Sequence, residues 1–127
     1  TAVMDSIPES KAGVGSATND SSREVGGALG IAIGGSILNE IYQSTIVIPA
    51  SASAKASIIQ ESFPAAMTVG QQMLASGNTD GALLIASARE SFIEGMVGAC
   101  VIAAIIALLA AIIVKLKMPD DEIVNEE

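Results

Sequence analysis

The feature that most restricts the fold is a run of twenty uncharged residues, Gly95 to Val114, near the end of the chain. In an α-helix, a segment of this length crosses the ~30 Å hydrocarbon layer of a bilayer. Lys115 and Lys117 follow directly, and Pro119 is expected to end the helix. Because 50% of the residues are hydrophobic and only 16% are charged, we prefer a transmembrane helix to the buried helix of a soluble protein.

A second span is expected from about Ser21 to Tyr42. Its uninterrupted apolar part, Val25 to Leu38, has fourteen residues and is too short to cross a bilayer alone. It reaches membrane length only if the polar residues at its ends lie at the two interfaces: Arg23 and Glu24 at one, Asn39 and Glu40 at the other. A helix of this kind suits the inside of a helix bundle better than a position surrounded by lipid.

Glycines recur every four residues in this second span, at Gly26, Gly30 and Gly34, and therefore lie on one helix face. Gly27 lies beside them. Without side chains in the way, the backbone of another helix can approach closely, and such rows are typical of helix contacts in membranes. We predict that these four glycines pack against another helix.

The basic residues indicate the topology. Four of the six flank the two spans on what would be one side of the membrane: Lys11, Arg23, Lys115 and Lys117. Near the opposite ends only Arg89 is basic. By the positive-inside rule, both chain ends are expected in the cytoplasm and the middle outside. Tyr42 and Phe92 would then lie near the outer interface, where aromatic side chains act as anchors.

The segment between the spans is expected to be partly helical. Short amphipathic helices are predicted near Ala54–Glu61 and Ala65–Ala75. A break is expected at Ser76–Asn78, with Asn78 or Thr79 as the N-cap of the helix that leads into the membrane.

These observations predict an all-α membrane protein with two transmembrane helices joined by a long outer loop. Because the chain opens at Thr1 without a Met, we interpret it as the C-terminal part of a longer protein. The expected segments are the end of a preceding helix and a cytoplasmic loop (1–20), a Gly-rich transmembrane helix (21–42), an extracytoplasmic loop (43–91), a second transmembrane helix (92–118) and an acidic cytoplasmic tail (119–127).

Composition argues against several other functions. The chain has no His and a single cysteine, Cys100, so a metal site lacks its usual ligands. Six scattered Lys and Arg residues do not form a nucleic-acid surface. No nucleophile-and-base pair or phosphate-binding loop is present. We therefore expect no enzyme, no catalytic residues, no cofactor and no nucleic-acid partner.

Asp20, Arg23 and Glu24 are the candidate functional residues. Asp20 and Glu24 lie four residues apart on one helix face, with Arg23 adjacent. Carboxylates at a membrane edge are functional candidates, and two close acids raise one another's affinity for protons. The alternative is structural: Asp20 caps the helix, and Glu24 pairs with Arg23 or Lys11.

The segment "IPESKAGVGSATNDSSREVGGALGIAIGGSIL" resembles the penultimate helix of fourteen-helix drug:proton antiporters of the major facilitator superfamily, the EmrB/QacA type. The resemblance continues more weakly through "IIQESFPAAMTVGQQM" and "ARESFIEGM", so it covers nearly the whole chain. The matching pattern is Pro8-Glu9, Gly13, Gly15 and Arg23-x-x-Gly26-Gly27-x-x-Gly30-x-Ala32.

This resemblance implies transmembrane transport, as part of a proton-coupled multidrug or small-molecule efflux permease in the plasma (inner) membrane. It implies as partners the lipid bilayer, the remaining helices of the parent transporter, a small lipophilic substrate and protons. In some members, carboxylates at the positions of Asp20 and Glu24 are implicated in cation recognition and protonation, whereas Arg23 adds a charge that those sites lack. The alternative is a stand-alone two-span protein that oligomerises through its glycine face without transport activity.

Overall fold

The computed structural model describes residues 12 to 117, and every regular element in this range is a helix. The predicted all-α fold is thereby confirmed for these residues. In chain order the elements are α2 (Ala12–Thr45), the 3₁₀ helix η2 (Ala50–Lys55), α3 (Ala56–Glu61), α4 (Phe63–Ala75) and α5 (Asp80–Lys117).

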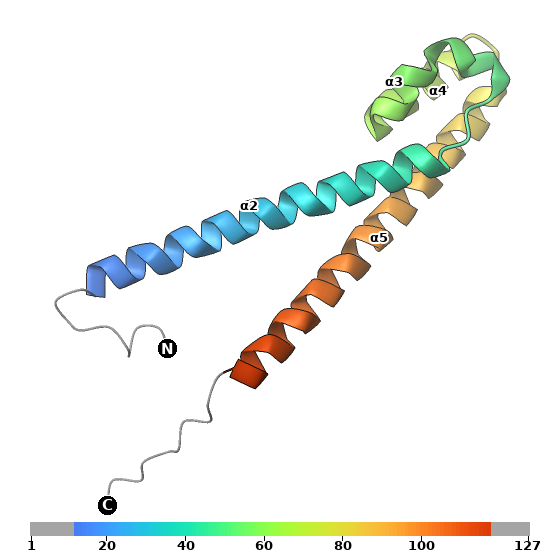
Figure 1. Cartoon of the computed structure of the whole chain (residues 1–127). Coiled ribbons are helices and arrows are strands. Elements are labelled where there is room, and N and C mark those ends of the chain that lie inside the picture. Colours follow the sequence, from blue (N-terminus) through green and yellow to red (C-terminus); the bar gives the residue numbers. More distant parts are fainter. Residues whose placement is uncertain (1–11, 118–127) are drawn as a thin grey trace, which may run out of the picture.

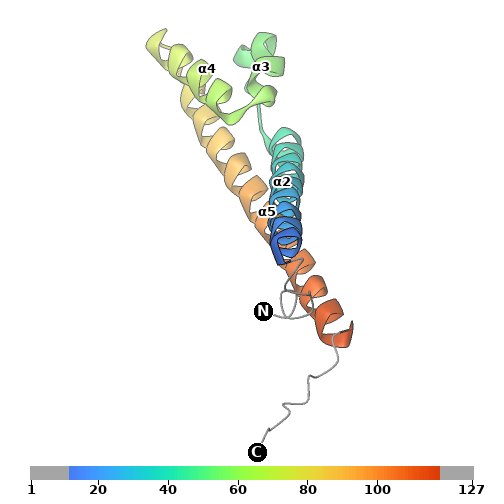
Figure 2. The same ribbon diagram turned by 90° about the vertical axis from the view of Figure 1, so that its left-hand side faces the viewer.

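The two long helices form an antiparallel V (Figure 1). α2 and α5 contact each other near the end of α2 and diverge toward the two chain ends. The short helices lie beyond the crossing, where α4 packs against the first half of α5. Figure 2 shows the molecule after a turn of 90°, so that the two arms of the V lie nearly one behind the other. In this view too, α3 and α4 lie at the closed end of the V. We call residues 46 to 79, which include η2, α3 and α4, the cap.

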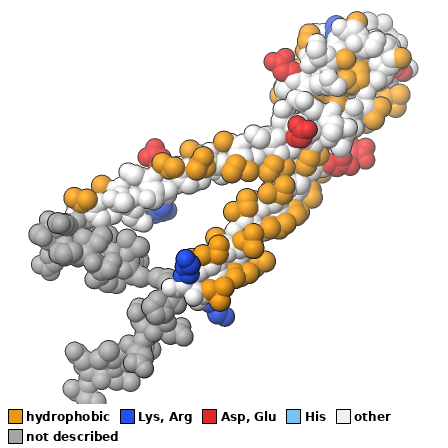
Figure 3. Space-filling model, in the orientation of Figure 1, with side chains coloured by type: hydrophobic (Ala, Val, Ile, Leu, Met, Phe, Trp, Pro, Cys, Tyr) orange, Lys and Arg blue, Asp and Glu red, His pale blue; other side chains and the backbone are white. Residues whose placement is uncertain are grey.

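Both long helices have the length and composition of membrane spans. Of the most apolar 18-residue window, 6% is buried within the chain for the first helix and 0% for the second. Apolar side chains accordingly cover much of both arms of the V (Figure 3). A surface of this kind requires lipid or other helices around it, because neither arm buries its apolar side chains against the rest of the chain.

Both long helices begin earlier than the spans expected from the sequence. α2 starts at Ala12 rather than at residue 21, and α5 starts at Asp80 rather than at residue 92. Polar residues are accommodated within α2 because their hydroxyls bond to the preceding turn: Thr18 Oγ1 donates to the Val14 carbonyl oxygen at 2.9 Å, and Ser22 Oγ donates to that of Thr18 at 2.8 Å.

The early start of α2 corrects one structural alternative. Asp20 does not cap this helix, because it lies well inside it. Two other expectations, the pairing of Glu24 with Lys11 and the acidic tail at 119–127, concern residues outside the described range.

The turn before α5 lies where the sequence places a break. Gly77 has a φ of 83°, a conformation that glycine adopts without steric cost. The Asn78 side-chain oxygen then accepts a hydrogen bond from the Asp80 backbone N–H at 3.0 Å. Asn78 thereby satisfies one of the N–H groups that the first turn of a helix leaves without a partner.

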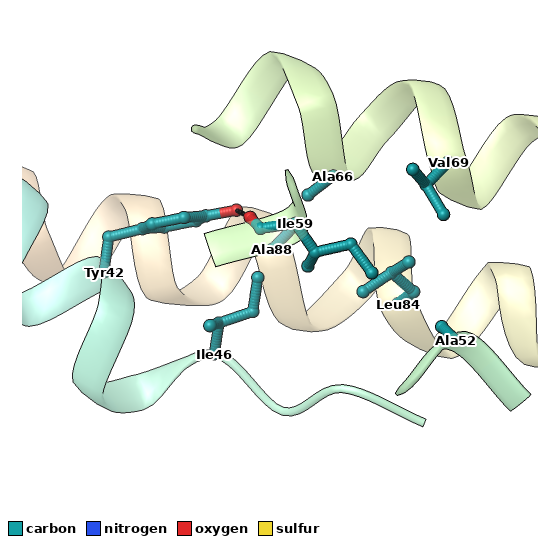
Figure 4. Close-up of a cluster of buried hydrophobic side chains, with 8 residues drawn as sticks. All are labelled: Tyr42, Ile46, Ala52, Ile59, Ala66, Val69, Leu84 and Ala88. Carbon is teal, nitrogen blue, oxygen red and sulfur yellow. Dashed lines mark hydrogen bonds between the residues drawn. The ribbon is translucent and has the colours of Figure 1, made fainter. Parts of the chain in front are cut away.

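The hydrophobic core lies at the closed end of the V, not along the apolar arms (Figure 4). Every helix contributes to it, together with the segment that follows α2: the buried side chains are Tyr42, Ile46, Ala52, Ile59, Ala66, Val69, Leu84 and Ala88. Phe63 and Phe92 stack beside it, with ring centroids 4.7 Å apart, and join α4 to α5. The cap is therefore a packed unit.

Candidate functional site

Asp20, Arg23 and Glu24 lie on the part of α2 that diverges from α5 (Figure 1). All three side chains are exposed. Because α2 is continuous through this region, Asp20 and Glu24 project from the same face one turn apart, with Arg23 at its edge. The nearby hydroxyls of Thr18 and Ser22 donate to helix carbonyls and not to these carboxylates.

This arrangement places two carboxylates and a guanidinium within two turns at the open end of the V. Carboxylates in such a position can exchange protons with water or attract a cation, and Arg23 lowers the net negative charge beside them. The described part of the chain supplies no second wall for a binding site here. Any ligand held by Asp20 and Glu24 would need groups from elsewhere to enclose it.

The four glycines predicted to pack against a helix have no partner within the described residues. A Cβ atom built on Gly26, Gly27, Gly30 or Gly34 would have nothing within 4 Å apart from its own helix and chain neighbours. Close packing of these glycines therefore stays a prediction about contacts with segments outside residues 12 to 117.

Close packing occurs instead at four glycines outside the predicted row, Gly70, Gly81, Gly95 and Gly98, the first three of which meet backbone atoms. A Cβ on Gly70 would lie 3.1 Å from the Gly81 carbonyl oxygen, where α4 meets α5. A Cβ on Gly95 would lie 2.7 Å from the Leu38 carbonyl oxygen, and one on Gly98 would overlap the Ile41 side chain. These contacts hold α5 against α4 on one side and α2 on the other.

The signal that points to these positions is an isolated glycine inside a helical pattern. A glycine costs about 1 kcal/mol relative to alanine in a helix interior, so its presence calls for a packing reason. Gly70 and Gly95 fit this description, whereas Gly81 lies in the first turn of α5. The repeated glycines of α2 are the more visible pattern, but repetition along one helix does not identify the partner.

An apolar groove runs between α2 and α5 on the open side of their crossing. Its volume is about 430 Å³, and its walls carry only Gly, Ala, Leu and Ile residues. No charged or hydroxyl side chain lines it, so the groove offers a polar ligand nothing to bind. The acidic site is therefore separate in chemistry from the groove, although both lie on the diverging arms.

Comparison with known proteins gives one informative similarity. Over 113 residues, the chain is 32% identical to the multidrug efflux pump LfrA of Mycolicibacterium smegmatis. This chain resembles part of an efflux pump. The aligned region covers 88% of the chain and 22% of that pump, so the chain spans about a fifth of its relative's length. No family model and no solved structure matches the chain.

Only 12% of the chain lies outside the aligned region, which must therefore include most of both long helices and the cap between them. The similarity therefore extends over the whole helix–cap–helix unit. A match confined to one apolar segment would mean less, because hydrophobic composition alone can raise the identity of such a segment.

Proposed function

We propose that this chain is the C-terminal part of a proton-coupled efflux permease of the major facilitator superfamily, of the fourteen-helix EmrB/QacA type. In this proposal α2 and α5 are its last two transmembrane helices. The observation that carries the proposal is the similarity to a multidrug efflux pump along 88% of the chain. The two membrane-length helices of the structure agree with such a role.

The proposed orientation puts both ends of the chain in the cytoplasm and the cap outside, in the plasma (inner) membrane. Lys115 and Lys117 lie in the last turn of α5, at the open end of the V. Arg23 lies toward the same end on α2. Basic residues gather on the cytoplasmic side of membrane proteins, which supports this orientation.

A permease also needs the remaining helices of the parent protein as partners. Transporters of this kind bind substrate near the middle of the membrane, between repeated multi-helix units. Two diverging helices do not enclose a path, and the apolar windows of α2 and α5 are almost entirely exposed. We propose that substrate moves only through the assembled parent, and that the substrate is a small lipophilic molecule.

Asp20 and Glu24 are proposed to take part in proton coupling or in attracting the substrate. Both carboxylates are exposed in this chain and share one face of α2. In the parent, that face would border the water-filled path through which protons enter. Arg23 beside them would limit the accumulation of negative charge when both acids are ionised.

The test is dye efflux from cells that express the full-length parent. Ethidium serves as a cationic probe and Nile red as an uncharged one, with and without an ionophore that collapses the proton gradient. We expect the parent to export at least one dye, and export to stop when the gradient is removed. Lack of export of either dye, or export that continues without the gradient, would contradict the proposal.

The role of the acids is tested in the same assay with Asp20→Asn, Glu24→Gln and the double variant. We expect the double variant to reduce export to the level of cells that lack the gene. Glu40→Gln is the matched control, since Glu40 is an exposed carboxylate on α2 near the crossing. Full export by the double variant would leave the permease proposal standing but remove Asp20 and Glu24 from its mechanism.

A further inference from the structure

The crossing of α2 and α5 gives a common reference level for the depth of both helices in a membrane (Figure 1). At the crossing, the backbone of Leu38 lies against Gly95. Leu38 is the last residue of the apolar run of α2, and Gly95 is the first residue of the uncharged run of α5. The crossing therefore marks the same edge of the hydrocarbon layer for both helices, the edge next to the cap.

On α5, the opposite edge falls at the lysines. The hydrocarbon layer is about 30 Å thick, which corresponds to about twenty residues of helix. Lys115 lies twenty residues from Gly95, and Lys117 lies two residues further along. Both lysines are therefore at the edge or beyond it, where water surrounds their charges.

On α2, the same measure separates the three charged residues of the candidate site. Asp20 lies eighteen residues from Leu38, whereas Arg23 lies fifteen and Glu24 fourteen residues from it. Along the helix axis, Asp20 is therefore within about 3 Å of the opposite edge, and Arg23 and Glu24 lie roughly 8 and 9 Å inside the layer. Arg23 is thus placed among the intramembrane charges and not with the basic residues at the surface.

The three charged residues also share one sector of α2. Asp20 lies between the other two, because Arg23 follows it by three positions and Glu24 by four. Positions three and four apart are neighbours on a helix, with about 5–6 Å between their Cβ atoms. Charged side chains of both signs accordingly lie on the α2 arm below the crossing (Figure 3). A ligand that reaches one of these charges is influenced by all three.

We call these three residues the charge triad. Its net charge is −1 when both carboxylates are ionised, because the guanidinium of Arg23 contributes +1 and does not lose its proton in proteins. The two acids alone would have a net charge of −2. Arg23 therefore halves the negative charge that a cationic ligand meets at this site.

Charge balance matters here because a bound substrate displaces water from the triad. An uncompensated charge inside a membrane is costly, whereas a balanced set is tolerated. A ligand with one positive charge brings the triad to zero. A ligand with two positive charges leaves an excess of +1, and its second charge is repelled by Arg23.

We propose that Arg23 is a specificity-determining residue, which limits the parent permease to cationic substrates that carry a single positive charge. This inference rests on the proposed function, since it names the substrate class of the same site. Arg23 acts through its charge and not through contact with a particular chemical group of the substrate.

The experiment compares two dyes that share one ring system. Ethidium carries one positive charge, and propidium carries an additional quaternary ammonium group. Binding to the purified full-length parent is measured by fluorescence anisotropy, and transport is measured as proton-driven dye uptake into inside-out membrane vesicles. We expect the unsubstituted parent to bind and transport ethidium, and to bind propidium about tenfold more weakly or worse.

Substitutions of Arg23 test whether charge is the cause. Arg23→Gln is expected to raise the affinity for propidium about tenfold or more, whereas Arg23→Lys should leave it low, because lysine keeps the charge. Arg89→Gln is the matched control, since Arg89 is an exposed arginine of α5 on the cap side of the crossing. This control should bind both dyes as the unsubstituted parent does. Arg23→Ala makes the same change in charge if Arg23→Gln does not fold.

A double variant separates net charge from local structure. Asp20→Asn alone brings the triad to zero and should weaken the binding of ethidium. Adding Arg23→Gln returns the net charge to −1 and should restore ethidium binding without propidium binding. A purely structural role of Arg23, such as pairing with Asp20, does not predict this recovery.

Two results would overturn the proposal. Equal binding of the two dyes by the unsubstituted parent would show that the site does not count charge. A propidium affinity that stays low in Arg23→Gln would show that the larger dye is excluded by its size.

The outcome for the proposed function can be recognised separately. Selective binding of ethidium by a parent that transports no dye would retain the role of Arg23 and reject efflux. Export of uncharged Nile red by a parent that binds neither cationic dye would retain efflux and reject the role of Arg23.

Discussion

The Tyr42 hydroxyl donates a hydrogen bond to the Ile59 carbonyl oxygen at 3.0 Å, and only 1% of the surface of Tyr42 is exposed. This bond joins the end of α2 to α3 across seventeen positions of sequence. Tyr42 was expected to be an aromatic anchor at the membrane interface. The structure gives it a second role, since its ring completes the core of the cap and its hydroxyl satisfies a buried carbonyl.

Tyr42→Phe is expected to destabilise the cap while leaving its packing almost unchanged. The substitution removes the donor and leaves the Ile59 carbonyl without its partner, a change that costs about 1–3 kcal/mol in a buried position. The measurement is thermal unfolding of the purified full-length parent. Ser44→Ala is the control, because the exposed Ser44 hydroxyl donates only to the Ile41 carbonyl on its own helix. Equal effects of the two substitutions would contradict the role of Tyr42.

At the scale of elements, the arrangement depends on close contacts between helix backbones. α4 lies on α5 where Gly70 and Gly81 face each other, and α2 lies on α5 at Gly95. Each glycine allows two helices to approach more closely than alanine would permit. Between these contacts the Val47 N–H donates to Ser87 Oγ at 2.8 Å, which fixes the chain where it leaves α2.

Gly81→Ala is expected to separate α4 from α5. The added methyl group would overlap the carbonyl oxygen of Gly70, which belongs to a helix backbone and does not move as a flexible side chain would. Overpacking of this kind costs about 1–3 kcal/mol. The matched control is Gly35→Ala on α2, where a Cβ meets nothing within 4 Å. In thermal unfolding, Gly81→Ala should lower the melting temperature relative to the unsubstituted protein, and Gly35→Ala should not. Equal melting temperatures for the two variants would argue against the backbone contact between α4 and α5.

At the scale of the whole molecule, the buried core is concentrated at one end and the apolar exposed surface at the other. The buried apolar core includes Ile46, Ile59 and Val69 of the cap, whereas the apolar windows of the arms are almost entirely exposed. Such a division suits a protein whose cap folds in water and whose arms lie in lipid and against other helices. The proposed orientation puts the cap on the outside.

Cysteine labelling of intact cells tests this orientation. In a Cys100→Ala parent, Ser53→Cys in the cap is expected to react with a membrane-impermeant maleimide. In the same Cys100→Ala parent, Lys117→Cys should react only after the membrane is permeabilised. In the unsubstituted parent, native Cys100, inside the apolar run of α5, should react neither before nor after permeabilisation. Both Ser53 and Lys117 are exposed in the structure, so a difference between them would reflect the membrane. Labelling of Lys117→Cys in intact cells would reverse the orientation.

Much of the fold is determined by residues that are close together in the sequence. The apolar run from Gly95 to Val114 and the glycine-spaced apolar segment of α2 each specify a long helix, because hydrophobicity and helical spacing act over neighbouring residues. The break before α5 follows from Gly77 and Asn78 for the same reason. Helix starts were less predictable, since serine and threonine hydroxyls bond to the preceding turn and allow α2 to extend back to Ala12.

The site is predictable only in part. The spacing of Asp20 and Glu24 determines that they share a helix face, and the structure keeps them there, exposed. Their partners do not follow from spacing. The sequence by itself determined two membrane-length helices and the faces on which their charges and glycines lie, because these depend on residues a few positions apart. Only the tertiary structure decided which glycines touch, where Tyr42 is buried and where a groove stays open. These depend on the registers at which the helices meet, α4 on α5 at Gly70 and Gly81, and α2 on α5 at Leu38 and Gly95, and no pattern of residues a few positions apart contains that information.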